Sequence, residues 1–273
     1  QWSIGIVLWL SLLVFYNHDV NPVYETALIP GNPVMLALVF IGVATLSSFL
    51  HLGNPANAPK ALSNLSSSWL SREILTIGLF TASLVLLLAI GWKTDNAVLL
   101  KYLVIPALAS GPGLLWAMAR IYMMPTIPAW NSWYTPVSFM TTALALGVIT
   151  LLFLGASNLI NMADHFTRVF QVVLIVTLLV EIFSAVIQQV KLPKIRQGMD
   201  TLVFDKGPFY RFFLVRMAIL IITCLLLTVP VLKPGLLPLA SYAAWYATVL
   251  LLVLIQELAG RLMFYASYFR LGV

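Results

Sequence analysis

Four residues with acid–base or hydrogen-bonding side chains lie at the ends of hydrophobic segments: His51, Glu73, Arg120 and Tyr122. His51 ends one segment, and Glu73 follows 22 residues later at the start of the next. Histidine titrates near neutral pH, and a carboxylate in a low-dielectric site can accept and relay a proton. Both hydroxyls of a quinol need acceptors that also take protons. The sequence therefore predicts a site that oxidises a quinol.

The composition indicates a membrane protein. The chain has 273 residues, of which 61% are hydrophobic and 9% charged, against about 45–50% and 25% in soluble domains. This balance excludes a soluble enzyme, a disordered chain and a fibrous protein. The single cysteine, Cys224, excludes an internal disulfide, a thiolate-held iron–sulfur cluster and a cysteine-anchored haem.

Eight hydrophobic segments separated by proline and glycine predict an all-α integral membrane protein, an eight-transmembrane-helix bundle in a single domain over residues 1–273. The expected spans are 1–17, 33–51, 70–92, 98–124, 136–157, 165–190, 210–232 and 239–269. The sequence begins at Gln1 inside a hydrophobic segment, so we expect the first span to be truncated.

The charges are distributed unevenly between the two membrane faces. We call face A the side that carries the connections after the second, fourth and sixth spans, and face B the opposite side. Face A has 11 of the 15 Lys and Arg residues and a net charge of +6, whereas face B is neutral. Either face A is cytoplasmic, as the positive-inside rule states, or it docks a soluble partner. The best docking candidates are Lys191, Lys194, Arg196, Lys206 and Arg211.

Further ionisable residues are predicted at membrane depth, where charges are costly and usually functional. Arg216 and Glu257 lie within spans toward face A. Glu257 and Arg261 are four residues apart on one helix, a spacing that favours a structural ion pair. For any one of these residues, snorkelling or a buried ion pair is the alternative to a functional role.

The three histidines argue against haem b, and no residues show metal-ligand spacing. His51 is predicted at face A, whereas His18 and His165 are predicted at face B, so His51 has no axial partner at its depth. With no electron acceptor of its own, the protein must pass electrons to a cofactor on another subunit. The quinol ring would lie against aromatic side chains such as Trp130 and Tyr122, which could alternatively belong to the interfacial aromatic belt.

Several short motifs, in this order, resemble the membrane anchor subunit of the anaerobic dimethyl sulfoxide reductase family. They are His51-Leu-Gly-Asn-Pro55, Ser71-Arg-Glu-Ile74, Arg120-Ile-Tyr122, Thr126-Ile-Pro-Ala-Trp130, Thr135-Pro136, and Glu257-Leu-Ala-Gly-Arg261 before Phe264-Tyr265. The resemblance covers the whole sequence except its start, where the family usually has more residues.

The resemblance implies a multi-pass subunit of the bacterial cytoplasmic membrane. It would bind a molybdopterin catalytic subunit and an iron–sulfur subunit, oxidise menaquinol, and pass electrons to the nearest [4Fe–4S] cluster for anaerobic respiration. The resemblance links the residues matching His51 and Glu73 to quinol oxidation. The expected quinol site also includes Arg72, Arg120, Tyr122 and Trp130. No metal is expected in this subunit. The family's exported catalytic subunits place docking on the outer side, which opposes the positive-inside rule, so sidedness stays open.

Two other classes of function stay open on the sequence. One is a passive anchor without a quinol site. The other is a secondary transporter, which would bind its substrate near the midplane between broken helices. Gly111-Pro112-Gly113 and the deep carboxylate of Glu181 are the features that fit a transporter, although no matching break occurs in the other half. The terminal electron acceptor is reduced by another subunit and is not encoded in this sequence.

Overall fold

The computed structural model describes residues 1–16, 32–50, 60, 62–93, 97–195, 208–235, 238 and 241–268. Long helices account for nearly all of this described part. They are α1 (Trp2–Tyr16), α2 (Pro33–Leu50), α3 (Trp69–Gly91), α4 (Ala97–Tyr122), α5 (Tyr134–Ala156), α6 (Asp164–Ile195), α8 (Pro208–Leu232) and α9 (Ser241–Ala266). The expected all-helical class is therefore confirmed for the described residues.

The helix ends agree with the predicted spans to within three residues, with one exception. Helix α6 continues to Ile195, five residues beyond the predicted end at 190. The prediction followed hydropathy, which falls where a polypeptide leaves the hydrocarbon. The backbone hydrogen bonds of a helix do not depend on hydropathy, so a helix can continue into polar surroundings.

Six of the helices are long and apolar enough to cross a membrane by length and composition: α3, α4, α5, α6, α8 and α9. Helices α1 and α2 are apolar but shorter. The 15 residues of α1 rise about 22 Å, less than the roughly 30 Å of a hydrocarbon core. The structure therefore supports six candidate spans, and the predicted count of eight transmembrane helices is not confirmed.

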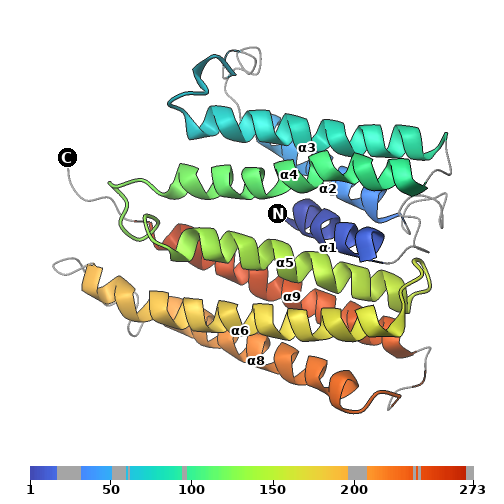
Figure 1. The fold of residues 1–273 in the computed structure, drawn as a ribbon. Helices are drawn as coiled ribbons and strands as arrows, with labels where there is room; N and C mark the ends of the chain where they lie inside the picture. Colours follow the sequence, from blue (N-terminus) through green and yellow to red (C-terminus); the bar gives the residue numbers. More distant parts are fainter. Residues whose placement is uncertain are drawn as a thin grey trace.

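The helices form two groups, which Figure 1 shows one above the other. Helices α2, α3 and α4 lie together at the top of the view, α5, α6, α8 and α9 at the bottom, and α1 between them. Helix α1 packs most extensively on α5, which also carries the most continuously buried surface of the protein. The α1–α5 contact therefore joins the two groups.

Two glycines allow α1 and α5 to approach closely. A Cβ added at Gly147 of α5 would overlap the backbone of Gly5 in α1, and one added at Gly5 would overlap the carbonyl of Ala143. Small residues at helix crossings are typical of membrane proteins, because close backbone approach increases van der Waals contact. On either side of the crossing, the Trp2 indole N–H donates to Thr150 Oγ1 at 2.7 Å and the Trp9 indole N–H donates to the Leu144 carbonyl at 3.0 Å.

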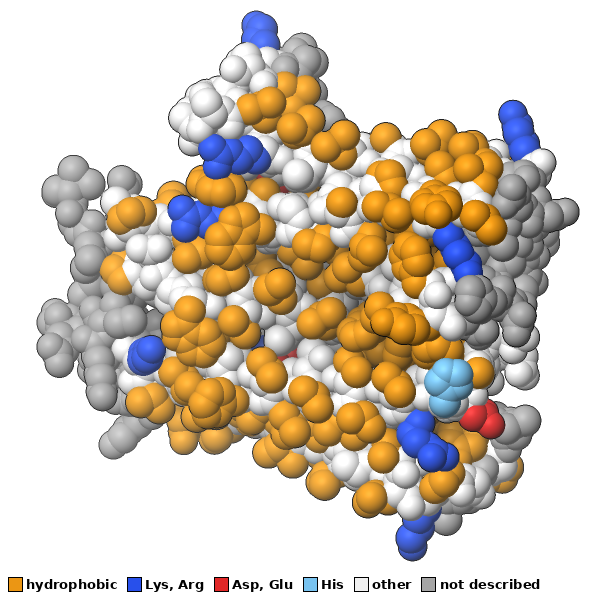
Figure 2. Space-filling model, in the orientation of Figure 1, with side chains coloured by type: hydrophobic (Ala, Val, Ile, Leu, Met, Phe, Trp, Pro, Cys, Tyr) orange, Lys and Arg blue, Asp and Glu red, His pale blue; other side chains and the backbone are white. Residues whose placement is uncertain are grey.

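The outer surface of the helices is apolar. Figure 2 shows hydrophobic side chains over the middle of the visible face, with Lys and Arg side chains toward both ends of the helices. Large exposed side chains include Leu79 and Leu86 on α3 and Phe183 on α6. In water such a surface would promote association. In a bilayer it contacts lipid without cost.

We expect Gly147→Ala to destabilise the protein by about 1–3 kcal/mol, the usual cost of overpacking. The reason is that the added methyl group meets backbone atoms, which cannot rotate away. The measurement is thermal unfolding of the purified protein in detergent. Gly78→Ala on α3 is the matched control, because nothing lies within 4 Å of its added Cβ. Equal melting temperatures for the two variants would show that the α1–α5 crossing does not limit stability.

Candidate functional site

Aromatic side chains gather at one end of the bundle, where α4 ends, α5 begins and α9 ends. The ring of Tyr122 makes edge-to-face contacts with Trp130, Phe139, Phe264 and Tyr265, at centroid distances of 5.4–6.0 Å. The ring of Trp130 stacks on Phe264 at 5.2 Å. We call these five residues the face-A aromatic cluster, because this end of the bundle is the predicted face A.

Hydrogen bonds fix the polar atoms of this cluster. The hydroxyls of Tyr122 and Tyr265 lie 3.0 Å apart and share a hydrogen bond. The indole N–H of Trp130 donates to the backbone carbonyl of Phe264 at 2.8 Å. Because that N–H is already used and the ring is buried against Phe264 and Tyr268, Trp130 supports the cluster from within and offers no free hydrogen-bond donor. The Tyr122–Tyr265 hydroxyl pair is the polar group that this cluster offers.

Glu73 lies on α3 just past the first helical turn. Ser68 caps this helix, its side chain accepting from the Ser71 amide at 3.2 Å. The carboxylate of Glu73 is partly buried and lies within electrostatic range of the Tyr122 hydroxyl. It forms no hydrogen bond or salt bridge with any described residue. The structure thus brings two predicted site residues, Glu73 and Tyr122, to the same end of the bundle.

The two predicted site arginines surround a tryptophan. The guanidinium of Arg72 lies over the Trp69 ring at 4.2 Å, and that of Arg120 lies over the same ring at 5.1 Å. Arg72 also donates to the carbonyls of Leu65 and Ser66, at 2.9 and 2.6 Å. Arg72 therefore holds the segment before α3, and its guanidinium is largely occupied by that role.

Only some of the remaining predicted residues lie in the part of the protein that the structure describes. His51, Arg196 and Lys206 lie outside the described residues, as does the side chain of Lys194. Lys191 and Arg211 are exposed at the face-A ends of α6 and α8. The ammonium of Lys191 lies 5.7 Å from the centre of the Trp133 ring.

A buried ion pair lies deeper in the second helix group. Arg216 of α8 donates a hydrogen bond to Glu181 of α6, and both side chains are 2% exposed. The amide of Gln256 on α9 donates to the other Glu181 oxygen at 3.4 Å and to Glu257 Oε1 at 3.1 Å. Three helices thus share one set of polar contacts.

Helix α5 completes this set through Thr142, and this corrects the predicted ion pair between Glu257 and Arg261. Thr142 Oγ1 donates to Glu257 at 2.7 Å and accepts from Arg261 at 2.8 Å. Between described residues, Arg216–Glu181 is the only salt bridge. The hydroxyl of Thr142 lies between the two charged groups, so they interact through it. We call Thr142, Glu181, Arg216, Gln256, Glu257 and Arg261 the buried polar network.

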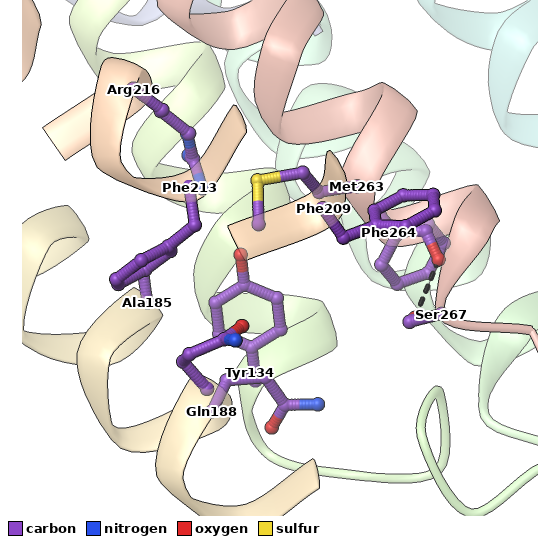
Figure 3. Close-up of a pocket in the computed structure, with 10 residues that line it drawn as sticks. Tyr134, Ala185, Gln188, Phe209, Phe213, Arg216, Met263, Phe264 and Ser267 are labelled. Carbon is purple, nitrogen blue, oxygen red and sulfur yellow. Dashed lines mark hydrogen bonds between the residues drawn. The ribbon is translucent and has the colours of Figure 1, made fainter. Parts of the chain in front are cut away.

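Space for this network depends on Gly260. A Cβ added at Gly260 would lie 2.7 Å from the Arg216 Cζ atom, so a larger residue there would force the guanidinium to shift. Arg216 also lines a small pocket that residues of α5, α6, α8 and α9 enclose (Figure 3). The pocket includes Tyr134 and Gln188 and has a volume of about 30 Å³, which holds about one water molecule.

The network and the aromatic cluster meet at Arg261. Its guanidinium lies 4.2 Å from the centre of the Phe139 ring, which itself packs on Tyr122. Arg261 also lies within electrostatic range of the Tyr122 hydroxyl. The arrangement provides a carboxylate and a pair of phenols near a membrane face. The buried polar network supports the phenols through Arg261.

Sequence reasoning missed several members of this arrangement. Gln256 and Thr142 belonged to no motif, and Gly260 and Tyr265 were part of quoted motifs but were not selected as site residues. One signal could have revealed the network: α6 has polar residues at 171, 177, 181, 184 and 188, and all five are buried. The last four, at 177, 181, 184 and 188, are spaced by three or four residues and so lie on one helical face, where polar groups inside a membrane need partners. No group of His, Cys, Asp and Glu among the described residues could hold a metal ion.

The comparisons with known proteins agree on one family. The family model described as DMSO reductase anchor subunit (DmsC) matches residues 1–267. The sequence is 29% identical to the C subunit of the anaerobic dimethyl sulfoxide reductase of Escherichia coli (strain K12) over 245 residues, which cover 86% of this protein and 80% of that one.

Two other relatives match over shorter stretches. The YnfH subunit of an anaerobic dimethyl sulfoxide reductase of E. coli is 34% identical over 113 residues, 41% of this protein and 39% of that one. The C subunit of the Haemophilus influenzae anaerobic dimethyl sulfoxide reductase is 30% identical over 145 residues, 52% of this protein and 50% of that one. Both of these matches span half or less of the relative's length.

We expect Glu181→Gln or Arg216→Met to destabilise the protein by about 3–5 kcal/mol, because each leaves the other member of a buried ion pair without its partner. Thermal unfolding of the full-length protein in detergent measures the loss. The double variant Glu181→Gln/Arg216→Met removes both charges and should lose much less than the sum of the single variants. Arg211→Met, an exposed arginine on the same helix, serves as control; additive single effects would contradict mutual compensation.

Proposed function

This chain belongs to the DMSO reductase anchor subunit (DmsC) family, and on that basis we propose that it is the menaquinol-oxidising subunit of a reductase complex. It anchors an iron–sulfur subunit and a molybdopterin catalytic subunit to the bacterial cytoplasmic membrane. Relatives named as the C subunits of anaerobic dimethyl sulfoxide reductases support this assignment. In this proposal, α1 and α2 also cross the membrane, giving eight spans with the six that are long enough alone.

The observation that carries the proposal is the Glu73 carboxylate. It is partly buried within electrostatic range of the Tyr122 hydroxyl, and it has no partner among the described residues. A carboxylate without a protein donor is available to accept a hydrogen bond and then a proton from a quinol hydroxyl. His51, which precedes Glu73 by 22 residues, takes the second proton in this scheme.

Oxidation of the quinol releases two electrons and two protons. The protons pass to His51 and Glu73. An iron–sulfur cluster of the partner subunit would accept the two electrons one at a time. Tyr122 and Tyr265 orient the quinol by hydrogen bonding, while the stacked rings of Trp130 and Phe264 pack behind these phenols and hold them in place. Arg120, whose guanidinium is held over Trp69, keeps positive charge near the site.

The positive charge of face A supports docking of the partner subunits at the same end. Lys191 and Arg211 are exposed there, and complementary charge speeds and orients association between proteins. Docking at face A also places the electron acceptor near the quinol site. The proposed docking surface consists of Lys191, Lys194, Arg196, Lys206 and Arg211.

We expect Glu73→Gln and His51→Arg to abolish quinol-dependent reduction, because each removes a proton acceptor. The assay compares reduction driven by a menaquinol analogue with reduction driven by a soluble dye that donates electrons directly to the partner subunits. Dye-driven activity should persist, which shows that the complex still assembles. Asp95→Asn provides a carboxyl-to-amide control at the predicted face B. Normal quinol turnover in both variants would leave the protein as a passive anchor.

Reversal of charge on the docking surface should weaken assembly. In the variant Lys191→Glu/Arg211→Glu, like charges oppose an acidic partner, so we expect less iron–sulfur subunit to co-purify in mild detergent. Electrostatic attraction is screened over about 8 Å at physiological salt, so the deficit should shrink as salt is raised. Lys93→Glu, an exposed residue at the opposite face, is the control. Equal co-purification of the partner with both variants would place docking elsewhere.

A further inference from the structure

A second cavity lies at face B, at the opposite end of the bundle from Glu73. It is enclosed by the end of α5, the start of α6, the end of α8 and the start of α9, the four lower helices of Figure 1. Its volume is about 490 Å³, within the roughly 300–1,000 Å³ of ligand pockets. Nothing in the proposed quinol chemistry uses it.

The floor of the cavity is polar and buried. Gln171 of α6 donates its side-chain amide hydrogen to the hydroxyl of Tyr246 on α9, and the two side chains are 5% and 1% exposed. The Tyr246 hydroxyl accepts this bond, so its own proton stays available for donation to an oxygen in the cavity. Leu152, Met162 and Pro230 contribute apolar walls. The cavity is therefore suited to an amphipathic molecule.

Two opposite charges line the outer part of the cavity. Asp164 and Arg168 are its only charged lining residues, and both are exposed. They lie four residues apart on α6, a spacing at which an ion pair is expected. They nevertheless form no salt bridge with each other or with any other described residue. The rim thus presents a separate anion and cation, with no net charge.

The depth of the cavity matches the interfacial layer of a bilayer. Asp164 is the first residue of α6, and Gln171 follows seven residues later, which corresponds to about 10 Å along a helix. The polar layer on each side of a hydrocarbon core is roughly 5–8 Å thick. With the rim at headgroup level, the floor would therefore lie at or just below the glycerol esters, at the edge of the hydrocarbon core.

We propose that this cavity binds the headgroup of a zwitterionic phospholipid, with the phosphate at Arg168 and the ammonium group at Asp164. The Tyr246 hydroxyl donates to an ester or phosphate oxygen. Basic pockets between membrane helices bind anionic lipids, but here the carboxylate of Asp164 repels a headgroup that carries only negative charge. Charge balance at the rim thus selects phosphatidylethanolamine over phosphatidylglycerol.

The test measures retained lipid on the intact complex. The complex is purified in mild detergent, stripped of lipid, mixed with dioleoyl phosphatidylethanolamine or dioleoyl phosphatidylglycerol, and analysed by native mass spectrometry. The wild-type protein should retain one phosphatidylethanolamine in preference to phosphatidylglycerol. Arg168→Gln should weaken that retention by about tenfold or more, because it removes a charge-assisted contact to phosphate.

Asp164→Asn separates a specific site from loss of folding. This change leaves Arg168 as the only rim charge, so binding of phosphatidylglycerol should rise relative to phosphatidylethanolamine, and misfolding cannot produce such a gain. Lys93→Gln removes a charge from the same face outside the cavity and should leave both lipids unchanged. Equal retention of the two lipids by the wild-type protein, or an unchanged preference in Asp164→Asn, would overturn the proposal. Neither result depends on quinol turnover.

Discussion

The buried ion pair between Arg216 and Glu181 is the constraint on which the second helix group depends. Removing two charges from water is expensive, and only close geometry with further hydrogen bonds offsets that cost. Glu181 receives hydrogen bonds from α8 and α9, and the network reaches α5 through Thr142. No two of these helices can slide past each other without exposing a charge to hydrocarbon. Apolar contacts alone would not define their register so narrowly, because lipid tails solvate leucine as well as another helix does.

The network also connects the interior to the membrane face. Arg261 takes part in it through Thr142, and its guanidinium lies against the ring of Phe139, which packs on Tyr122. The position of the Tyr122 ring is therefore fixed by four aromatic rings that pack around it, one of which contacts the Arg261 guanidinium. A rigid donor lowers the entropy cost of orienting a substrate. Glu73 on α3 and Tyr122 on α4 belong to the first helix group, whereas Tyr265 on α9 belongs to the second, so the candidate site lies where the two groups meet.

Much of this arrangement follows from the sequence, and the rest depends on three-dimensional packing. Helix ends could be predicted because hydropathy reports the thickness of the bilayer. The gathering of Glu73, Tyr122 and Trp130 at one end followed from counting spans, since alternate connections must lie on the same side. The partners of Glu181 could not be predicted, because they come from residues 35 and 75 positions away. The expected Glu257–Arg261 pair was wrong in detail for the same reason: spacing along one helix says nothing of Thr142 on another.

The two helix groups differ in the kind of polar side chain that they bury. Among the described residues, every charged side chain that is fully buried lies in α6, α8 or α9: Glu181, Arg216 and Glu257. In α1–α4 the buried polar side chains are serines, and two of them, Ser11 and Ser83, bond to carbonyls of their own helix. A serine satisfied within its own helix places no demand on neighbouring helices, whereas a buried charge demands partners from several. The first group is therefore held mainly by apolar packing, in which α3 and α4 make the most extensive helix–helix contact among the described residues, whereas shared polar contacts fix the second group.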